Sequence, residues 1–520
     1  EYNKTIGEHT FGILAGYSWE QEDYRYVQGS RDKFPGNDLP YLNAGSPDNQ
    51  KSEGTGNAWA IQSGFGRLRY NFNERYLFES TVRYDGSSRF PQSKKFGFFP
   101  SVAAGWRLSE ENFFKENESL GFISNLKLKV SWGRLGNQNI GNYPYQSVYE
   151  LGQNYPFGDT YTQGAAVTTA VDPTIKWEET ETIDGGLEAV FWNGLLSVNA
   201  SYFNRRTYDI LYKPSGSVST ILGQKISEMN TGELKNFGWE FEVGHRNKIG
   251  DVSYNVNANL SIIKNKLTTL GVGNVEQLNG MVGNGSDLFI GYPIQMYYGY
   301  VSDGVFLDEN DIKSWYDQSK VTPNPQPGDI RYKDISGPDG VPDGKIDPNY
   351  DRVYLGSRIP KFTFGLNLGV EYKGLDLSVL LQGVAGVTGM LDGFAGWAFR
   401  GDGNIQKWQA EGRFDPANPT RYPAYPRLED LSNSTTPNIV TSDFWTQDAS
   451  YIRLKNIQLG YTFPKKMLQA AKISNLRVYV QAENPLCWNK YKPGWDPEIN
   501  TSGNYYPILA TYTFGVNFKF

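Results

Sequence analysis

The residues whose types and spacing could bind a metal ion lie between Asp334 and Asp351. This stretch reads DISGPDGVPDGKIDPNYD, so closely spaced aspartates alternate with glycines. Calcium prefers several oxygen ligands, and glycine permits the sharp turns that bring such ligands together. The predicted ligands are Asp334, Asp343, Asp347 and Asp351. Calcium is the only cofactor that the sequence suggests.

The fit to a calcium loop of the D-x-[DN]-x-[DN]-G type is incomplete. Residues 338–342 interrupt the spacing between Asp334 and the run from Asp343 to Asp347. A solvated acidic loop would have the same composition without binding a metal. Calorimetry with calcium distinguishes these alternatives, because a solvated loop gives no heat of binding.

Glu178, Glu179 and Glu181 are the carboxylates most easily imagined as a general acid and base. Glycoside hydrolysis needs two carboxylates across a cleft at a fixed separation, whereas neighbours on a strand point to opposite faces. A solvated or lumenal strand face is the better interpretation. The sequence contains no nucleophile elbow, phosphate-binding loop or metal-ligand cluster for catalysis, and its two histidines, His9 and His245, are far apart. We therefore predict that the protein is not an enzyme.

Composition narrows the class of protein. Aromatic residues make up 15% of the chain and charged residues only 20%, and no apolar run reaches the roughly 18 residues of a membrane-spanning helix. A membrane-spanning barrel needs no such run, because every second residue faces its lumen. The net charge of -6 argues against nucleic acid as a partner. Cys487 is the only cysteine, so an intrachain disulfide is excluded.

Elsewhere the sequence predicts β-strands, in which apolar and polar residues alternate with a period of two. From Tyr512 to Phe520, aromatic and aliphatic residues alternate with threonine, glycine, asparagine and lysine. One face would meet lipid, the other the lumen, and Phe520 would lie in an interfacial aromatic belt. Arginine near the middle of the lipid face costs about 2 to 4 kcal/mol, which assigns Arg67, Arg69 and Arg83 to the lumen.

The same alternation recurs and predicts about fourteen strands in an antiparallel transmembrane β-barrel with long extracellular loops. Short turns such as Asn193-Gly194 and Lys373-Gly374 would lie on the periplasmic side. The first strand is expected from His9, with irregular structure over residues 25–57. A change of parity predicts a bulge near Lys455-Asn456, and the only helix is expected over residues 465–472.

The longest loops are expected over residues 135–180, 265–360 and 385–449. The middle loop would contain either no spanning strand or two, with an extra hairpin over residues 295–306. These loops carry many aromatic residues, which would either stack on sugars and dock a partner or pack the loops against one another. Examples are Trp315, Trp397, Trp408 and Tyr422.

Several motifs resemble the SusC/RagA family of TonB-dependent outer-membrane receptors, and they occur in order over nearly the whole chain. They are RYLFESTVRYDGSSRF (75–90), FGFFPSVAAGWRLSEENFF (96–114), GNQNIGNY (136–143), WEET (177–180), IPKFTFG (359–365), YIRLKNIQLGYTFP (451–464), LRVYVQAEN (476–484) and YTFGVNF (512–518). The resemblance implies a barrel of twenty-two strands around an N-terminal plug. Residues 1–520 would be the C-terminal part of such a barrel, with no plug domain, as a fragment or as one chain of a split receptor.

The resemblance also implies a function and partners. Such receptors import bulky nutrients through the outer membrane of Gram-negative bacteria, mostly oligosaccharides and sometimes peptides. A SusD-like lipoprotein would act as a lid, TonB would supply energy through the absent plug, and outer-membrane lipid would surround the barrel. A self-contained passive pore and a soluble carbohydrate-binding or hydrolytic all-β protein are the alternatives.

Overall fold

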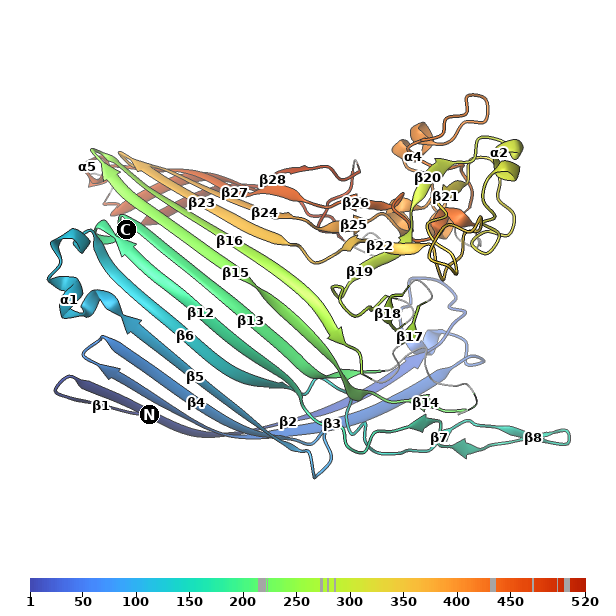
Figure 1. Cartoon of the computed structure of the whole chain (residues 1–520), viewed down its shortest axis with the longest axis horizontal. Helices are drawn as coiled ribbons and strands as arrows, with labels where there is room; N and C mark the ends of the chain where they lie inside the picture. The colour runs from blue at the N-terminus through green and yellow to red at the C-terminus, as the bar shows by residue number, and fades with distance from the viewer. Residues whose placement is uncertain are drawn as a thin grey trace.

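The computed structural model describes residues 1–213, 221, 223–271, 275–277, 280–284, 287–430, 436–469, 472–492, 494–499 and 506–520. Fifteen antiparallel strands form one curved sheet, here called the wall (Figure 1). Each strand pairs with its neighbours in chain order. The strands of the wall are β1 (Tyr2–Ile6), β2 (His9–Ser30), β3 (Lys51–Phe72), β4 (Tyr76–Ser87), β5 (Phe96–Arg107), β6 (Ile123–Asn137), β12 (Glu178–Phe191), β13 (Leu196–Tyr212), β15 (Met229–Ile249), β16 (Val252–Thr269), β23 (Phe362–Tyr372), β24 (Leu375–Ala385), β27 (Tyr451–Thr462), β28 (Asn475–Asn489) and β29 (Thr511–Lys519). Among the described residues, β1 and β29 each pair with one strand only.

The wall has one apolar face and one polar face, because side chains alternate along each strand. The cross-strand register keeps them in phase: Leu187 lies opposite Leu128 and Ala200, whereas Glu188 lies opposite Lys127 and Asn199. The predicted two-sided strands of an antiparallel barrel wall are confirmed. The predicted fourteen strands become fifteen.

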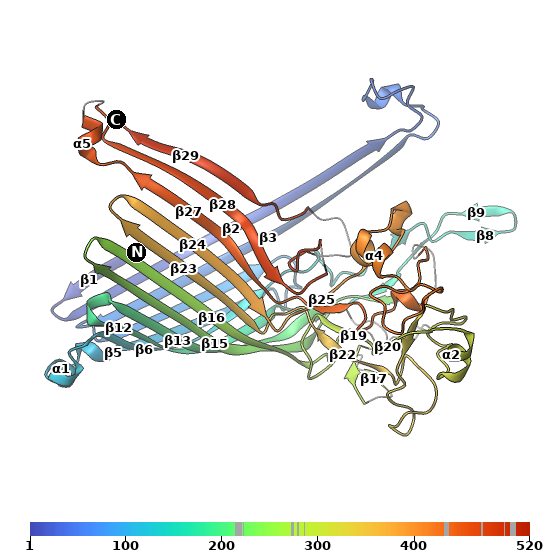
Figure 2. The same ribbon diagram turned by 90° about the horizontal axis from the view of Figure 1, so that it is seen from above.

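Short connections collect at one end of the wall and long ones at the other (Figure 1). Lys373 and Gly374 join β23 to β24, and their φ angles of 47° and 90° are those of a two-residue turn that favours glycine at the second position. At the long-loop end, β2 and β3 extend beyond their neighbours (Figure 2). The predicted division into tight turns and long loops is confirmed.

The remaining elements are short and belong mainly to the long loops. The strands are β7 (Glu150–Leu151), β8 (Tyr155–Phe157), β9 (Thr160–Thr162), β10 (Ala165–Ala166), β11 (Thr169–Ala170), β14 (Lys225–Ile226), β17 (Val275–Glu276), β18 (Val282–Gly283), β19 (Met296–Tyr300), β20 (Ser302–Val305), β21 (Ile330–Tyr332), β22 (Arg352–Ser357), β25 (Thr388–Met390) and β26 (Thr446–Asp448). The α-helices are α1 (Asn112–Lys115), α2 (Glu309–Ser314), α3 (Gly393–Gly396), α4 (Lys407–Gly412) and α5 (Lys465–Leu468). No helix in the described part of the chain is long and apolar enough to cross a membrane.

Three predictions about the elements were wrong. The wall begins with β1, before His9, because this short strand pairs along β2. Residues 25–57 are not all irregular: β2 and β3 continue to Ser30 and from Lys51, with both edges of this extension exposed to solvent. The helix after β27 is not the only one and ends at Leu468; residues 470–471 of the predicted span lie outside the described residues.

The predictions for the connection between β16 and β23 and for the bulge in β27 agree better with the structure. No described strand between β16 and β23 joins the wall, since these two strands pair directly. The hairpin expected over residues 295–306 does not form: β19 pairs with β22, and β20 pairs with β21. The bulge near Lys455 is confirmed, because the register of β27 shifts between Leu454 and Asn456. It lets Ile452 and Ile457 share the apolar face despite their opposite parity.

Candidate functional site

The polar face of the wall carries charged side chains in pairs. The carboxylate of Glu188 in β12 forms ion pairs with two lysines of β6. Its oxygens lie 2.6 Å from Lys127 Nζ and 3.0 Å from Lys129 Nζ. At the other side of the wall, Arg477 of β28 reaches across to Asp376 of β24, with Nε to Oδ1 at 3.0 Å. These groups are partly exposed, so they offer both charge and hydrogen bonds to a solute.

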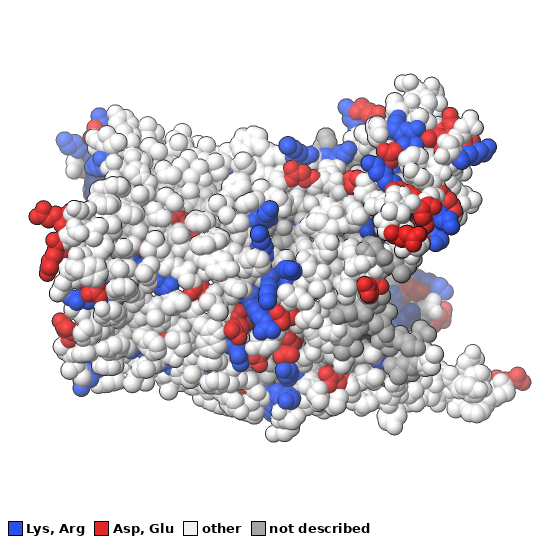
Figure 3. All heavy atoms as spheres, in the orientation of Figure 1, with Lys and Arg blue, Asp and Glu red and all other residues white. Residues whose placement is uncertain are grey.

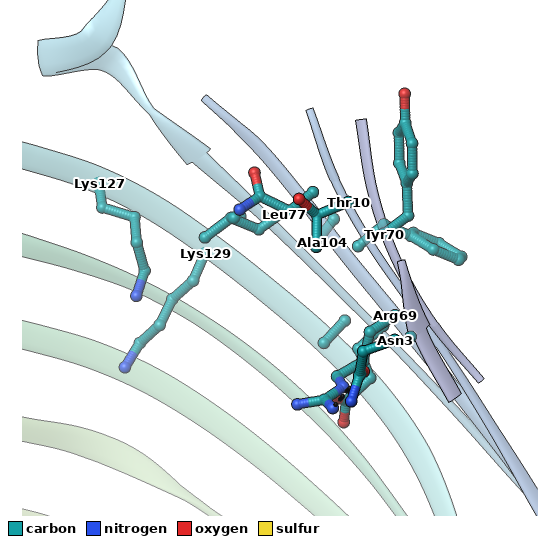
Figure 4. Close-up of a pocket in the computed structure, with 14 residues that line it drawn as sticks. Asn3, Thr10, Arg69, Tyr70, Leu77, Ala104, Lys127 and Lys129 are labelled. Carbon is teal, nitrogen blue, oxygen red and sulfur yellow. Dashed lines mark hydrogen bonds between the residues drawn. The ribbon is translucent and has the colours of Figure 1, made fainter. Parts of the chain in front are cut away.

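Near the N-terminal edge, the polar face is hollowed over β1 to β6, with a volume of about 480 Å³. Arg69, Lys127 and Lys129 lie on the same side of the ribbon, whereas Tyr70 points away (Figure 4). Arg69 is paired with Glu1. Small residues such as Gly12 and Ala103 also line the hollow. Carboxylates already pair with the three cationic side chains, so the hollow can hold a hydroxylated group.

The three arginines predicted to face the lumen are on this polar face. Arg69 lies opposite Glu79, and Arg83 donates to Asp85 at 2.8 Å and to Ser63 at 2.8 Å. Arg67 has the same parity as Arg69. That prediction is confirmed by the register of β3 and β4.

The glutamates considered as an acid–base pair are divided between the two faces. Glu178 accepts from Asn137 at 3.1 Å, while Glu179 and Glu181 lie on the other side of β12, near Arg134 at 3.4 and 3.8 Å. The last two are not lumenal, because they share a face with Ile183. They form ion pairs beyond the end of the apolar surface.

The loops over residues 270–361 and 386–450 pack together at the long-loop end of the wall, and are here called the loop assembly (Figure 1). A cluster of buried aromatic and aliphatic side chains holds them: Trp445 is 1% exposed, and Tyr332 and Tyr425 are fully buried. Of the aromatic residues singled out from sequence, Trp315, Trp397 and Trp408 pack against this cluster. Tyr422 does not, and is 74% exposed. Loop packing therefore explains three of the four.

An ion pair with a buried carboxylate joins the two loops of the assembly. Asp329 accepts Arg427 Nε at 2.5 Å and Asn438 Nδ2 at 2.8 Å, residues about a hundred positions further along the chain. Burial raises the pKa of Asp329 even though Arg427 lies beside it. A buried carboxylate of this kind is stable only while its partners remain in place.

A second ion cluster centres on Asp311 of α2. Arg331 Nη1 lies 3.0 Å from Asp311 Oδ1, and Arg421 also pairs with this carboxylate. Arg331 stacks on Trp315, with the guanidinium carbon 3.6 Å from the ring centroid. Burial works against ionisation of Asp311, but the hydrogen bond from Arg421 and the backbone N–H of Leu307 lower its pKa. Sequence reasoning missed both clusters, because their members are too far apart in the chain to form a motif.

The predicted calcium ligands lie between β21 and β22 and bond mainly to the loop itself. Asp351 accepts backbone N–H groups from Ile335 at 2.7 Å and Asp347 at 2.7 Å. Asp347 pairs with Lys320, Asp334 accepts the N–H of Gly344 at 2.6 Å, and Asp343 accepts that of Lys345 at 3.0 Å. In the described ranges, no three His, Cys, Asp or Glu side chains gather as a metal site. Calcium binding stays a prediction.

A second loop region projects from the wall and exposes its aromatic side chains. The hairpin β8–β9 stands clear of the rest of the molecule (Figure 2). Tyr155, Phe157 and Tyr161 are 64, 67 and 78% exposed. These rings do not contribute to the buried cluster of the loop assembly, so they are free to contact another molecule.

Comparison with known proteins gave consistent results. The model of the family described as "TonB dependent receptor-like, beta-barrel" matches residues 2–484. TonB-dependent receptor P3 of Formosa agariphila is 28% identical over 560 residues, covering 100% of this chain and 51% of that protein. TonB-dependent receptor SusC of Bacteroides thetaiotaomicron is 29% identical over 529 residues, covering 100% of this chain and 49% of that protein. The chain thus spans about half the length of these relatives.

A solved structure has the same fold over the whole chain. The RagAB peptide transporter matches with a TM-score of 0.77 and 24% sequence identity, covering 100% of this chain and 54% of that one. The RagAB peptide importer in its "open-open" state gives a TM-score of 0.78 at the same identity and coverage. At this level of identity the match supports the fold.

Proposed function

Because this chain belongs to the family of TonB-dependent receptor-like β-barrels, we propose that it forms the barrel part of an outer-membrane importer of bulky nutrients. The observation that carries the proposal is the continuous polar face over fifteen strands, backed by an apolar face. Its hollow, with Arg69, Lys127 and Lys129, gives a hydrated cargo a surface with hydrogen-bond donors. The protein acts by binding and transport, without catalysing a reaction.

The complete importer would need strands and a plug from sequence outside these 520 residues. In support, the chain covers 49 to 51% of the two curated relatives described, and β1 and β29 each have one neighbouring strand among the described residues. The plug would receive energy from TonB. A SusD-like lipoprotein would cover the long-loop end of the wall, which carries the loop assembly and the exposed rings of the β8–β9 hairpin. The host would be a Gram-negative bacterium.

The cargo is proposed to be an oligosaccharide, with a peptide as the second candidate. Exposed rings such as Tyr155 and Tyr161 can stack on the flat apolar faces of sugar rings. The peptide alternative is favoured by the fold shared with a structure described as a peptide transporter. Specificity depends on loops more than on strands, so both cargoes remain compatible with the same wall.

Uptake by cells tests the proposal. Cells with and without the intact gene are offered a labelled mixture of oligosaccharides or of peptides, with or without an agent that collapses the proton gradient. We expect uptake of the oligosaccharides only in the gene-containing, energised cells. Uptake that continues after collapse of the gradient would instead support the passive pore. Failure of both cargoes in energised cells would contradict nutrient import.

The mass of the membrane-extracted protein tests the proposed division of the receptor. Under denaturing conditions, we expect either a polypeptide about twice as long as this chain or a second chain that co-purifies with it. A lone chain of 520 residues that forms a heat-resistant barrel would contradict the need for further strands.

A further inference from the structure

A row of charged residues crosses the apolar face of the wall. Arg134, Glu181, Arg206, Lys235 and Lys266 lie directly opposite one another on five adjacent strands, from β6 to β16. Their parity is that of the apolar residues on each strand, so they do not face the lumen. Figure 3 shows a column of basic and acidic side chains crossing an otherwise mostly uncharged face.

The row marks a sharp boundary along the strands. Towards the short turns, β16 places Ile262, Leu260, Ala258 and Val256 on the same face, and β15 places Trp239 and Phe241 beside them. Towards the loops, the strands continue with charged residues such as Glu233. An apolar stretch from Val252 to Ile262 matches the 9 to 11 residues of a tilted membrane-spanning strand. The charged row thus lies at the edge of the hydrocarbon layer.

Positive charge is in excess on the β15–β16 side of the row. Arg134 pairs with two carboxylates, those of Glu179 and Glu181, so its side of the row has no excess of positive charge. Arg206 and Lys235 share one carboxylate, that of Glu233, at 2.6 and 3.8 Å.

Two further lysines increase this excess. Lys264 and Lys266 lie on the same face of β16, one opposite Phe237 and the other opposite Lys235, and both are exposed. Among the described residues, no carboxylate lies within ion-pair distance of either lysine. Clustered ammonium groups repel one another, so an anion that lies between them lowers the energy of the cluster.

We propose that Arg206, Lys235, Lys264 and Lys266 bind the phosphate of an anionic lipid in the leaflet next to the loop assembly. The four cations attract the phosphate, while Ile262 and Trp239 contact its acyl chains. These two residues lie opposite each other, closer to the membrane centre than Lys264 by two residues and than Lys235 by four. A lipid meets both requirements, whereas free phosphate uses only the charge. This lipid site lies on the apolar face of the wall, so the proposal holds whichever cargo contacts the polar face.

Lipid titration tests the site on the membrane-extracted protein with all its co-purifying chains. The probes are short-chain phosphatidylglycerol, phosphatidylcholine of the same chain length and inorganic phosphate. We expect phosphatidylglycerol to bind most tightly, and Lys264→Gln with Lys266→Gln to weaken it by at least about tenfold, since each cation near an anionic surface contributes. Phosphatidylcholine binding should not change.

The matched control is Lys127→Gln with Lys129→Gln. These lysines have the same spacing along a strand but lie on the polar face, which lipid does not reach. Migration of unheated protein on a gel verifies that both variants are folded. Equal losses in the two double variants, unchanged affinity in the Lys264 and Lys266 variant, or equal affinity for the two lipids would overturn the proposal. Inorganic phosphate that competes as strongly as phosphatidylglycerol would overturn the lipid as the ligand.

Discussion

In the wall, the side chains of Val130 and Phe514 are 54 and 70% exposed, whereas in the loop assembly those of Trp445 and Tyr425 are 1 and 0% exposed. The wall is one sheet thick, so cross-strand hydrogen bonds hold it and both faces remain accessible. The loop assembly has a hydrophobic core and partly buried ion pairs, as a small soluble domain has. The two regions therefore differ in what stabilises them, and a substitution should act through a different physical term in each.

Removing core volume from the loop assembly should have the largest effect. Trp445→Ala creates a cavity beside Tyr425 and removes the hydrogen bond from Nε1 to the Asn438 carbonyl oxygen, 2.7 Å long. We expect local destabilisation of about 3 to 5 kcal/mol, measured as faster hydrogen exchange in the loop assembly. The wall should keep its protection. Tyr422→Ala, at a 74% exposed position, is the control and should change little; loss of protection throughout the wall would show that the two regions are not separate.

A charge placed on the apolar face should affect the wall next most strongly. Val256→Arg puts a guanidinium in the middle of the apolar stretch of β16, which costs about 2 to 4 kcal/mol in lipid. Asn257→Arg, one residue further along, puts the same group on the polar face and should have almost no effect. Denaturant unfolding of the protein in vesicles measures both. Equal costs would contradict the assignment of the two faces.

Acid should weaken the loop assembly before the wall through Asp311. The pKa of this carboxyl is below its ordinary value of 3.8 in the folded protein, so its stabilising contribution is complete above that value and is lost as the pH falls through the lower, folded pKa. We expect hydrogen exchange around α2 to increase below about pH 4, after correction for intrinsic rates. Asp329 has a raised pKa and acts in the opposite direction. In Asp311→Asn, the acid-dependent increase around α2 should disappear; if it persists, another group is responsible.

Breaking an ion pair on the polar face should have the smallest effect. Glu188→Gln removes the pairing with Lys127 and Lys129, but all three side chains are about a quarter or more exposed. We expect a change of about 0 to 1 kcal/mol in the unfolding free energy of the wall. The denaturant midpoint measures it. A loss of several kcal/mol would mean that the wall depends on buried charges in the same way as the loop assembly.

The faces of the wall were predictable from sequence because a strand that separates lipid from water must alternate. The same rule explains why the extension of β2 and the strand β1 were not predicted. Beyond the apolar stretch, β2 carries Glu20, Gln21, Glu22 and Asp23 in succession, since both of its faces meet water and no alternation is required. β1 escaped prediction because five residues are too few to establish a period.

The loop assembly was much less predictable, for a different reason. Its contacts join residues such as Asp329 and Arg427, whose separation in sequence no local pattern encodes. The acidic stretch from Asp334 to Asp351 stood out because its members are close in sequence, although they bond largely to their own loop. The charged row on the apolar face was overlooked as well, because its members lie on five different strands, and the separate notice of Glu179 and Glu181 did not reveal it.

The bulge in β27 bears on how the chain tolerates changes of length. Leu380 and Leu381 of β24 lie opposite Asn456 and Leu454, so Lys455 is the single residue without a counterpart on β24. Deletion of Lys455 alone would keep Leu454 and Ile457 on the apolar face and Arg453 on the polar face. Deletion of one residue elsewhere in the strand would turn all the side chains on one side of the deletion to the wrong face. Lys455 is therefore itself an inserted residue, and the residues on either side of it keep the same faces with or without it.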